Sequence, residues 1–232
     1  MGYKIASYTH PGKREQNEDR FGIYPGPYGL LILAADGLGG HEGGEDAASL
    51  AVQTISSLLA DMAPGEEALK RAIDVANRDI QALGGPMRTT LAALWIGEDR
   101  FLVGHVGDSR VYHFRDGALL QRTMDHSVAQ MAVLVGEMHP DQLRSSPERN
   151  HLLRVLGDPA GAQPEVEVFD ALPGDRFLVC TDGFWEPVTE SIMVDTMNQS
   201  QDPESWLLLM RAYLHLQDQP HQDNNTAVCL ML

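Results

Sequence analysis

The sequence predicts an α+β fold in which two antiparallel β-sheets pack as a central sandwich flanked by helices, giving α-β-β-α layers. Segments with the period of a strand outnumber segments with the period of a helix. The strand segments cluster in antiparallel hairpins, with tight turns such as Asp116-Gly117 between them. The helical segments come in pairs, which suits a position outside the two sheets.

The expected strands are short apolar or alternating runs with turn residues at their ends. The run at residues 30–35 is apolar throughout, which is typical of a buried strand. In chain order, the strands are expected at residues 3–9, 21–24, 30–35, 88–96, 100–106, 109–115, 118–123, 164–169, 175–181 and 226–232.

Two neighbouring segments carry apolar residues at helical spacing. The first covers residues 48–62 and ends before Pro64-Gly65, and the second covers residues 66–83. The glycine-rich segment 37–44 between strand and helix is predicted to be a loop that lets the backbone approach a ligand. Further helices are expected at residues 126–136, 189–198 and 203–216, a short turn or helix at 151–156, and a polar flap loop at about 137–150.

The totals indicate one soluble domain covering residues 1–232. The chain has 43% hydrophobic residues, no internal repeat and no low-complexity linker. It has no run of about 18 apolar residues and no apolar leader. Cys180 and Cys229 lie in apolar runs, as buried reduced thiols do. The net charge of −16 argues against nucleic acid or an anionic membrane as partner. We therefore expect a cytoplasmic monomer.

Three predicted strands deliver an aspartate beside a glycine. Asp36 and Asp182 each end an apolar run and precede glycine, and Asp108 follows Gly107. Carboxylates gathered in one place repel one another, and their pKa values rise unless a cation lies among them. A hard divalent metal is the natural cation for a site made of oxygen ligands. The pattern therefore indicates a metal-dependent hydrolase.

Each of these motifs taken alone has a plain structural interpretation. An Asp-Gly pair can be only a turn, and the segments 17–19 and 223–226 can be solvated acidic turns. Glu18 and Asp19 are adjacent, so in a strand they would face opposite sides. Arg14 can bind a phosphate bidentately, yet a lone arginine in a charged segment is normally solvated. Repetition of Asp-Gly after buried strands favours the functional interpretation.

The order of the motifs makes a specific set. From about residue 10 to the end, the chain resembles the metal-dependent protein phosphatases of the protein phosphatase 2C class, in their compact bacterial form. The motifs that carry the resemblance are Arg14-x-x-Asn17-Glu18-Asp19, Asp36-Gly37-Leu38-Gly39-Gly40-His41, Gly107-Asp108-Ser109-Arg110, Thr181-Asp182-Gly183 and Asp223-Asn224.

The resemblance implies two Mn²⁺ or Mg²⁺ ions in the cleft between the sheets. Asp36 would bridge the two metals and, with the bridging hydroxide, carry the reaction. The carbonyl of Gly37 would complete the shell of one ion, together with water held by Glu18 and Asp19.

The remaining ligands follow from the same resemblance. Asp182 and Asp223 would hold the other ion. Asp108, with Asp182, would match a third and weaker metal site of bacterial relatives. Arg14 would bind the substrate phosphate.

The resemblance also implies an activity and partners. The chain would hydrolyse phosphoserine and phosphothreonine in proteins, by direct attack of the metal-bridging hydroxide and without a covalent phosphoenzyme. It would oppose a bacterial Ser/Thr kinase, and the stretch around Trp185-Glu186 resembles small phosphatases of which some are tied to type VI secretion. One alternative is a catalytically inactive binding module, but all the metal-binding acids are present. A haloacid dehalogenase type enzyme would need Asp-x-Asp, and Leu38 occupies the second position.

The chain departs from the family pattern at a few places. Leu38 stands where animal relatives carry a histidine proposed as general acid, so metal-bound water or another group must supply that proton. His41 is either that group or a plain loop residue. Arg88 precedes Thr89-Thr90 where glycine is usual, and it is either a packing change or an extra phosphate contact. His105 and His126 are predicted to be structural.

Overall fold

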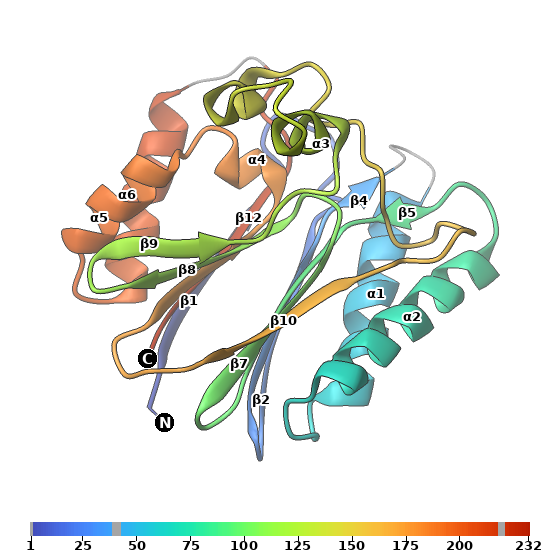
Figure 1. Ribbon diagram of the computed structural model, residues 1–232, viewed down its shortest axis with the longest axis horizontal. Helices are drawn as coiled ribbons and strands as arrows, with labels where there is room; N and C mark the ends of the chain where they lie inside the picture. The colour runs from blue at the N-terminus through green and yellow to red at the C-terminus, as the bar shows by residue number, and fades with distance from the viewer. Residues whose placement is uncertain (1, 39–42, 218–220) are drawn as a thin grey trace.

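Two five-stranded antiparallel sheets lie face to face in the computed structural model (Figure 1). Helices cover the outer sides of both sheets, so the predicted α+β sandwich is confirmed. The structure describes residues 2–38, 43–217 and 221–232.

One sheet, called here the β11 sheet, has the strand order β1-β12-β11-β8-β9. Its strands are β1 (Lys4–His10), β12 (Asn225–Met231), β11 (Arg176–Cys180), β8 (Arg110–Arg115) and β9 (Ala118–Arg122). The other, called the β6 sheet, has the order β10-β7-β6-β3-β2. Its strands are β10 (Glu165–Asp170), β7 (Arg100–Val106), β6 (Leu91–Ile96), β3 (Gly29–Ala35) and β2 (Arg20–Gly26). A small ladder pairs β4 (Gly37–Leu38) with β5 (Arg88–Thr89).

Four helices form the outer layers. Helices α1 (Gly44–Leu59) and α2 (Glu66–Leu83) pack on the β6 sheet, and α6 (Pro203–Leu216) packs on the β11 sheet with α5 (Glu190–Asn198) beside it (Figure 1). Shorter helical segments lie near one end of the sandwich: α3 (Val128–Leu134), the 3-10 helix Pro140–Ser145 and α4 (Asp182–Trp185). Within the described ranges, no helix combines the length and apolar character needed to cross a membrane.

Strand β3 shows why the sequence forms these layers. Its side chains alternate between two apolar clusters, because successive residues of a strand face opposite sides. Leu31 and Leu33 pack toward α1 and α2, and Leu30 and Ile32 pack between the two sheets. A third cluster lies between the β11 sheet and its helices. A strand buried on both faces must be apolar throughout, as residues 30–35 are.

The structure differs from the predicted elements at several places. The helix expected at 48–62 is Gly44–Leu59, the polar loop expected at 137–150 contains the 3-10 helix Pro140–Ser145, and α4 was not predicted.

Three further differences involve distant parts of the chain. Residues 151–156 form no helix but make two isolated bridges, Ser127 to Leu152 and Thr89 to Leu156. The strand expected at 88–96 is interrupted at Thr90, whose N–H donates to the Asp36 carbonyl at 2.9 Å. The segment 37–44 contains the short strand β4 and the first residue of α1. In each case backbone groups bond to distant parts of the chain, which local periodicity does not reveal.

Candidate metal centre

A cavity of about 480 Å³ opens beside the loops that follow the buried strands. All the predicted site residues except Asp19 line it: Arg14, Glu18, Asp36, Gly37, Asp108, Asp182 and Asp223. A larger hollow of about 600 Å³ lies among the loops near Tyr28 and Pro64, and it contains none of these residues. The smaller cavity is therefore the site where the predicted chemistry comes together.

Asp36 follows the last residue of β3, and two threonines fix its main chain. Its N–H donates to Thr90 Oγ1 at 3.0 Å, and its carbonyl accepts from the Thr90 N–H at 2.9 Å and from Thr89 Oγ1 at 2.8 Å. Thr90 Oγ1 also lies 2.6 Å from Ser109 Oγ, in the turn that carries Asp108. The backbone of Asp36 is thereby satisfied, and its carboxylate is left for the cavity.

Gly37 packs against the start of α1 at very short range. A Cβ atom built there would lie 2.3 Å from the Gly44 carbonyl oxygen and 2.9 Å from the Glu18 carbonyl oxygen. Any side chain would push these segments apart, so only glycine fits beside Asp36. Close approach of the backbone is thus what this Asp-Gly pair provides.

Asp182 begins α4 directly after β11, and the second Asp-Gly pair packs in the same way. A Cβ atom at Gly183 would lie 2.0 Å from the Asn224 carbonyl oxygen, so α4 rests against the turn that carries Asp223. At the other end of α4, Trp185 Nε1 donates to the Asp108 carbonyl at 2.9 Å. Helix α4 therefore connects three carboxylates of the cavity.

Asn224 ties the N-terminal loop to this end of the molecule. Its Oδ1 accepts from the Glu18 N–H at 2.8 Å, and its Nδ2 donates to the carbonyls of Gln16 and Pro11 at 2.8 and 2.9 Å. These bonds hold Glu18 at the cavity although 206 residues separate it from Asn224. Asn224 is thus a positioning residue for the loop.

Arg14 and Asp223 form an ion pair at the rim of the cavity. Arg14 Nη2 lies 2.7 Å from Asp223 Oδ2, and the two side chains are 59% and 41% exposed. The Asp223 hydrogen bond raises the pKa of Arg14 above its ordinary value, so the guanidinium is charged. An exposed, charged guanidinium at the rim is accessible to an anion that enters from solvent.

Asp19 lies behind the cavity wall and is not part of its lining. It is 2% exposed, and Thr181 Oγ1 donates to its Oδ2 at 2.8 Å. Within the described part of the chain, no group donates a hydrogen bond to the buried Oδ1. Burial raises the pKa of Asp19 to about 7, against the hydrogen bonds from Thr226 and Thr181. The resemblance implies that Asp19 holds a water near a metal. In the structure Asp19 is buried and is not among the residues that line the cavity.

The carboxylates of the cavity destabilise one another's charged forms. Burial raises the pKa of Asp36 well above the ordinary value, and the neighbouring charges of Asp182 and Asp19 raise it further. Burial likewise raises the pKa of Asp182, with repulsion from Asp108 next. Burial raises the pKa of Asp108 itself to about 7. These carboxyl groups become fully ionised at neutral pH only if a cation lies among them.

The donor set fits a hard divalent cation. The cavity offers carboxylate oxygens and the carbonyl of Gly37, the ligand types that Mg²⁺ and Mn²⁺ prefer. The unpartnered Oδ1 of Asp19 and the raised pKa values of its neighbours are the strain that such a cation would relieve. Cys180 is fully buried in β11 and plays no part in this set.

Several residues of the site were not predicted. Thr89, Thr90 and Thr181 hold the backbone or carboxylate of an acidic residue, and Asn150 and Leu152 line the cavity from the segment after the 3-10 helix. Polar threonines at the ends of apolar strands are the signal that could have found the first three. Asn150 and Leu152 belong to a stretch, Asn150-His151-Leu152-Leu153, that resembles the flap segment of bacterial relatives, but their place at the cavity depends on the path of the flap.

The departures from the family pattern have three outcomes. Leu38 does line the cavity, so an apolar side chain stands there. His41 lies outside the described residues. Arg88 donates to the neighbouring Met87 carbonyl at 2.8 Å and is not among the residues lining the cavity, so the expectation of an extra phosphate contact finds no support in its position.

Comparison with known families identifies the class of protein. The family model described as protein phosphatase 2C matches residues 7–225. The chain belongs to the protein phosphatase 2C family. It is 34% identical over 202 residues to the serine/threonine protein phosphatase PstP of Mycobacterium tuberculosis, covering 83% of this chain and 38% of that relative. It thus spans well under half of that relative's length. It is 30% identical to the serine/threonine phosphatase stp of Listeria welshimeri, covering 81% of this chain and 80% of the relative.

Solved structures agree over the whole chain. The catalytic domain of PstP in complex with two manganese ions has a TM-score of 0.84 at 30% identity, covering 99% of this chain and 97% of that one. PppA of Pseudomonas aeruginosa, described as a key regulatory component of the type VI secretion system, has a TM-score of 0.81 at 28% identity with the same coverage.

Proposed function

We propose that this chain is a metal-dependent phosphatase that removes phosphate from phosphoserine and phosphothreonine in proteins. The observation that carries the proposal is the convergence of Asp36, Asp108, Asp182 and Asp223 on one cavity with Arg14 at its rim. Burial raises the pKa of Asp36, Asp108 and Asp182, and repulsion from other cavity carboxylates raises the pKa of Asp36 and Asp182 further. A divalent cation would be stabilised by such a group of carboxylates. The named activities of the Mycobacterium and Listeria relatives support the substrate class.

The proposed metal ligands divide into two groups. Asp36 and the Gly37 carbonyl, with Glu18 and Asp19 acting through water, would hold one Mn²⁺ or Mg²⁺ ion. Asp36 would also reach the second ion. The two manganese ions in the PstP catalytic domain support this count.

Asp182 and Asp223 would hold that second ion, and Asp108 with Asp182 would form a third, weaker site. When bound, paired divalent cations lower the pKa of a water between them and stabilise the charge that develops at phosphorus. The role of the chain is to hold these carboxylates together in the wall of one cavity.

Arg14 is proposed to orient the substrate phosphate. Its Nη2 donates one hydrogen bond to Asp223 Oδ2 at 2.7 Å, and a phosphate can accept two parallel hydrogen bonds from the same guanidinium. Arg14 would therefore exchange one anion for another when substrate binds, while Asp223 turns to the metal. Leu38 carries no transferable proton, so the leaving alkoxide takes its proton from water or from a group other than residue 38.

The proposal extends to organisation and partners. Residues 1–232 would be one catalytic domain with a flap at about 137–150, acting as a cytoplasmic monomer. The substrate would be a phosphorylated protein, and the enzyme would oppose a Ser/Thr kinase. The likeness to PppA supports a kinase pathway connected with type VI secretion. Neither nucleic acid nor a membrane is proposed as a partner, since the net charge is −16.

The alternative is a catalytically inactive phosphatase-like binding module. It requires a site that has lost a ligand or its geometry. Every acid of the motif set is present, and seven of the eight predicted residues line one cavity. This favours the enzyme.

The test is release of phosphate from a phosphothreonine peptide, with Mn²⁺ and with EDTA, for wild type, Asp182→Asn and Asp99→Asn. Asp99 is a matched control because its side chain is 77% exposed and does not line the cavity. We expect metal-dependent release in wild type and Asp99→Asn, and none in Asp182→Asn. A folded wild type that binds Mn²⁺ but releases no phosphate from peptides or from phosphorylated proteins would support the binding module instead.

A further inference from the structure

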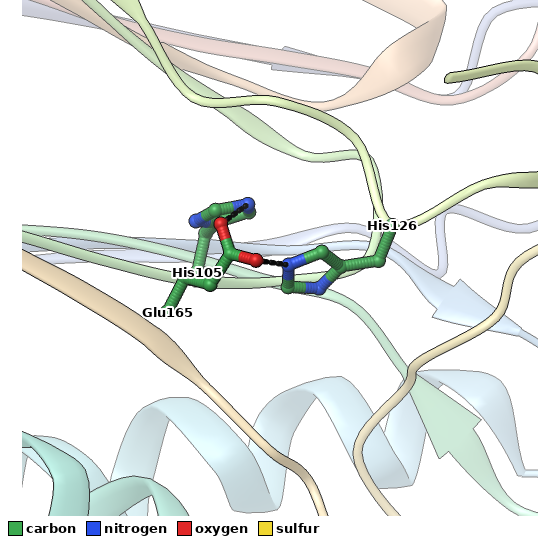
Figure 2. A group of neighbouring side chains, drawn as sticks. All are labelled: His105, His126 and Glu165. Carbon is green, nitrogen blue, oxygen red and sulfur yellow. Dashed lines mark ion pairs between the residues drawn. The ribbon is translucent and has the colours of Figure 1, made fainter. Parts of the chain in front are cut away.

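Two histidines and a glutamate gather beside the candidate metal centre without belonging to it. His105 is the second-last residue of β7, His126 lies just before α3, and Glu165 begins β10. Figure 2 shows the Glu165 carboxylate directed toward both imidazole rings. The histidines are 3% and 7% exposed, whereas the glutamate side chain is 47% exposed. One ligand atom from each lies within 4.8 Å of the others, so the group has the composition of a metal site.

Hydrogen bonds determine where the protons of both rings lie. His126 Nδ1 accepts from the Gly107 N–H at 3.2 Å, so the proton of the neutral ring is on Nε2. This Nε2 lies 3.3 Å from Glu165 Oε1, which can accept its proton, and 3.3 Å from Arg154 Nη1, which can only donate, so the proton is directed to Glu165. His105 Nε2 lies 2.7 Å from the Met124 carbonyl, which can only accept, so this nitrogen also carries a proton. Burial lowers the pKa of both histidines, that of His126 to about 4, and therefore both rings are neutral near pH 7.

This proton arrangement is the opposite of what a metal ligand needs. A metal-binding histidine offers a bare nitrogen to the ion and donates its other N–H to an acceptor. Here the nitrogens that face Glu165 are the protonated ones. The rings also stack at 4.4 Å with an angle of 25° between their planes, so their in-plane lone pairs do not meet at one point. The guanidinium of Arg154, 3.1 Å from Glu165 Oε1, already supplies positive charge.

The same contacts instead make His126 the junction of two cavity segments. Its N–H donates to the Gly107 carbonyl at 2.9 Å while its ring accepts from the Gly107 N–H, so both polar groups of that residue are held. Its carbonyl accepts from the Leu153 N–H at 2.7 Å, next to Leu152 of the cavity wall. The residue after Gly107 is Asp108.

Gly107 has little freedom to adopt another position. Its φ of +94° lies in the left-handed region, and a Cβ atom there would be 2.8 Å from Thr90 Cγ2. The turn is thus pressed against Thr90 on one side and bonded to His126 on the other. Loss of the His126 ring would leave the Gly107 N–H without its acceptor and release the turn that carries Asp108.

We propose that His126 is a positioning residue that holds the Gly107–Asp108 turn, and that Glu165 acts through His126 by keeping its proton on Nε2. The inference rests on the proposed function, because Asp108 matters only if it binds metal. Glu165 Oε1 lies 3.3 Å from His126 Nε2 and 3.1 Å from Arg154 Nη1, and Glu165 is not among the residues that line the cavity.

The first test is Mn²⁺ binding by isothermal titration calorimetry, which requires no turnover. The variants are His126→Leu, His126→Asn, Asp108→Asn and the control His113→Leu. His113 is also buried, with 2% of its surface exposed, and lies 3.1 Å from buried Asp175, so its loss also costs stability, and it does not line the cavity. We expect His126→Leu to weaken the weakest Mn²⁺ step about tenfold or more, as loss of outer partners of metal ligands does. His126→Asn, which keeps an acceptor near the Nδ1 position, should stay closer to wild type, and His113→Leu should bind as wild type does.

An unchanged weakest step in His126→Leu, or an equal change in His113→Leu, would overturn the proposal. So would an unchanged step in Asp108→Asn, since His126 could then not act through Asp108. Failure of the phosphatase assay with these binding results intact would reject the proposed function alone.

The second test is the tautomer of His126, read from the ¹⁵N shifts of its ring in the histidine-labelled protein. We expect a neutral ring protonated on Nε2 from pH 6 to 8, with this preference weakened in Glu165→Leu. A ring protonated on Nδ1 would contradict the proposal. Loss of the Nε2 proton on addition of Zn²⁺ would overturn it in favour of a second metal site.

Discussion

Aspartates are buried in two regions of this molecule, and the two regions offset the cost of burial differently. Just before β11, Asp175 is fully buried and accepts two hydrogen bonds from Arg115 of β8, at 2.6 and 2.8 Å. Burial alone would raise its pKa, but the hydrogen bonds from Arg115 and the Leu172 N–H outweigh this and hold the pKa below its ordinary value. In the cavity of the candidate metal centre, burial and repulsion raise the pKa of Asp36 and Asp182.

The difference separates carboxylates that serve the fold from those that we propose serve chemistry. A structural carboxylate finds its cation in the chain, as Asp125 does in its bidentate pair with Arg110 at 2.7 and 2.6 Å. The cleft carboxylates outnumber the cations that the described chain brings to them, and Arg14 at the rim is paired with Asp223. Carboxylates that are buried together without a cation from the chain have raised pKa values, and bound metal would stabilise their charged form. Such a group of carboxylates therefore indicates a functional site.

The largest effect is expected at Asp36, one of the cavity carboxylates. We expect Asp36→Asn to reduce Mn²⁺-dependent phosphate release by on the order of 10²–10³-fold or more, because a ligand and its charge are lost at the point of reaction. The same change removes repulsion, so the EDTA-treated variant should melt at a higher temperature than wild type. Peptide dephosphorylation and scanning calorimetry measure the two effects. Unchanged turnover would reject the assignment of Asp36, and a lower melting temperature would reject the repulsion.

Asp125→Asn should have the opposite effect on stability. It removes the bidentate carboxylate partner of the Arg110 guanidinium, which is 1% exposed. The more distant Glu190 carboxylate at 3.6 Å and the Trp185 ring, whose centroid lies 3.3 Å from the guanidinium carbon, then remain against it. Breaking a buried pair by removing one partner costs about 3–5 kcal/mol. Urea unfolding of the metal-free protein measures this cost. A loss below about 1 kcal/mol would mean that Asp125 is not the counter-charge that Arg110 needs.

Sequence patterns predicted the position of the cavity carboxylates better than that of the structural carboxylates Asp175 and Asp125. Asp36 and Asp182 were found because each follows an apolar run and precedes glycine, a local pattern. Asp175 and Asp125 carry no such pattern, and their partners Arg115 and Arg110 lie 60 and 15 residues away. Their role follows from strand pairing, which a single sequence does not specify.

The fold was predictable to a similar degree and for a similar reason. Residues 66–83 and 203–216 were predicted with the bounds that α2 and α6 have, because both are periodic helices with clear ends. Residues 151–156 were not, since their backbone bonds to Thr89 and Ser127 instead of to itself. Segments that bond to distant residues, including the wall at Leu152, are the part of the site that a local pattern does not determine.

The pH dependence of the metal-free protein should separate the two regions. The folded-state pKa of Asp19 and Asp108 is about 7, above the 3.8 of an ordinary aspartate, so between about pH 4 and 7 the folded state binds more protons than the unfolded state. Stability should therefore fall as the pH rises through that window. Asp175 has a lowered pKa, so its contribution is present at neutral pH and is lost as the pH falls below about 4.

Saturating metal should reverse the first of these trends. Mn²⁺ at 100 times its Kd adds about 2.7 kcal/mol of stability when it binds only the folded state. Chemical unfolding from pH 4 to 8, with EDTA and with Mn²⁺, measures both curves. A metal-free protein whose stability rises steadily between pH 4 and 7 would contradict the raised pKa values of the cleft.

The smallest expected effect concerns Arg14, the cation that pairs with Asp223 at the rim of the cavity. Arg14→Ala should raise KM for a phosphopeptide about tenfold and leave kcat nearly unchanged, because a charged hydrogen bond to phosphate is worth about 1.5–3 kcal/mol and acts equally in substrate and transition state. Arg14→Lys keeps the charge but loses the bidentate geometry, so its KM should fall between the two. Steady-state kinetics at fixed Mn²⁺ separates the parameters. A fall in kcat with KM unchanged would mean that Arg14 stabilises the transition state for phosphoryl transfer instead of binding the substrate phosphate uniformly.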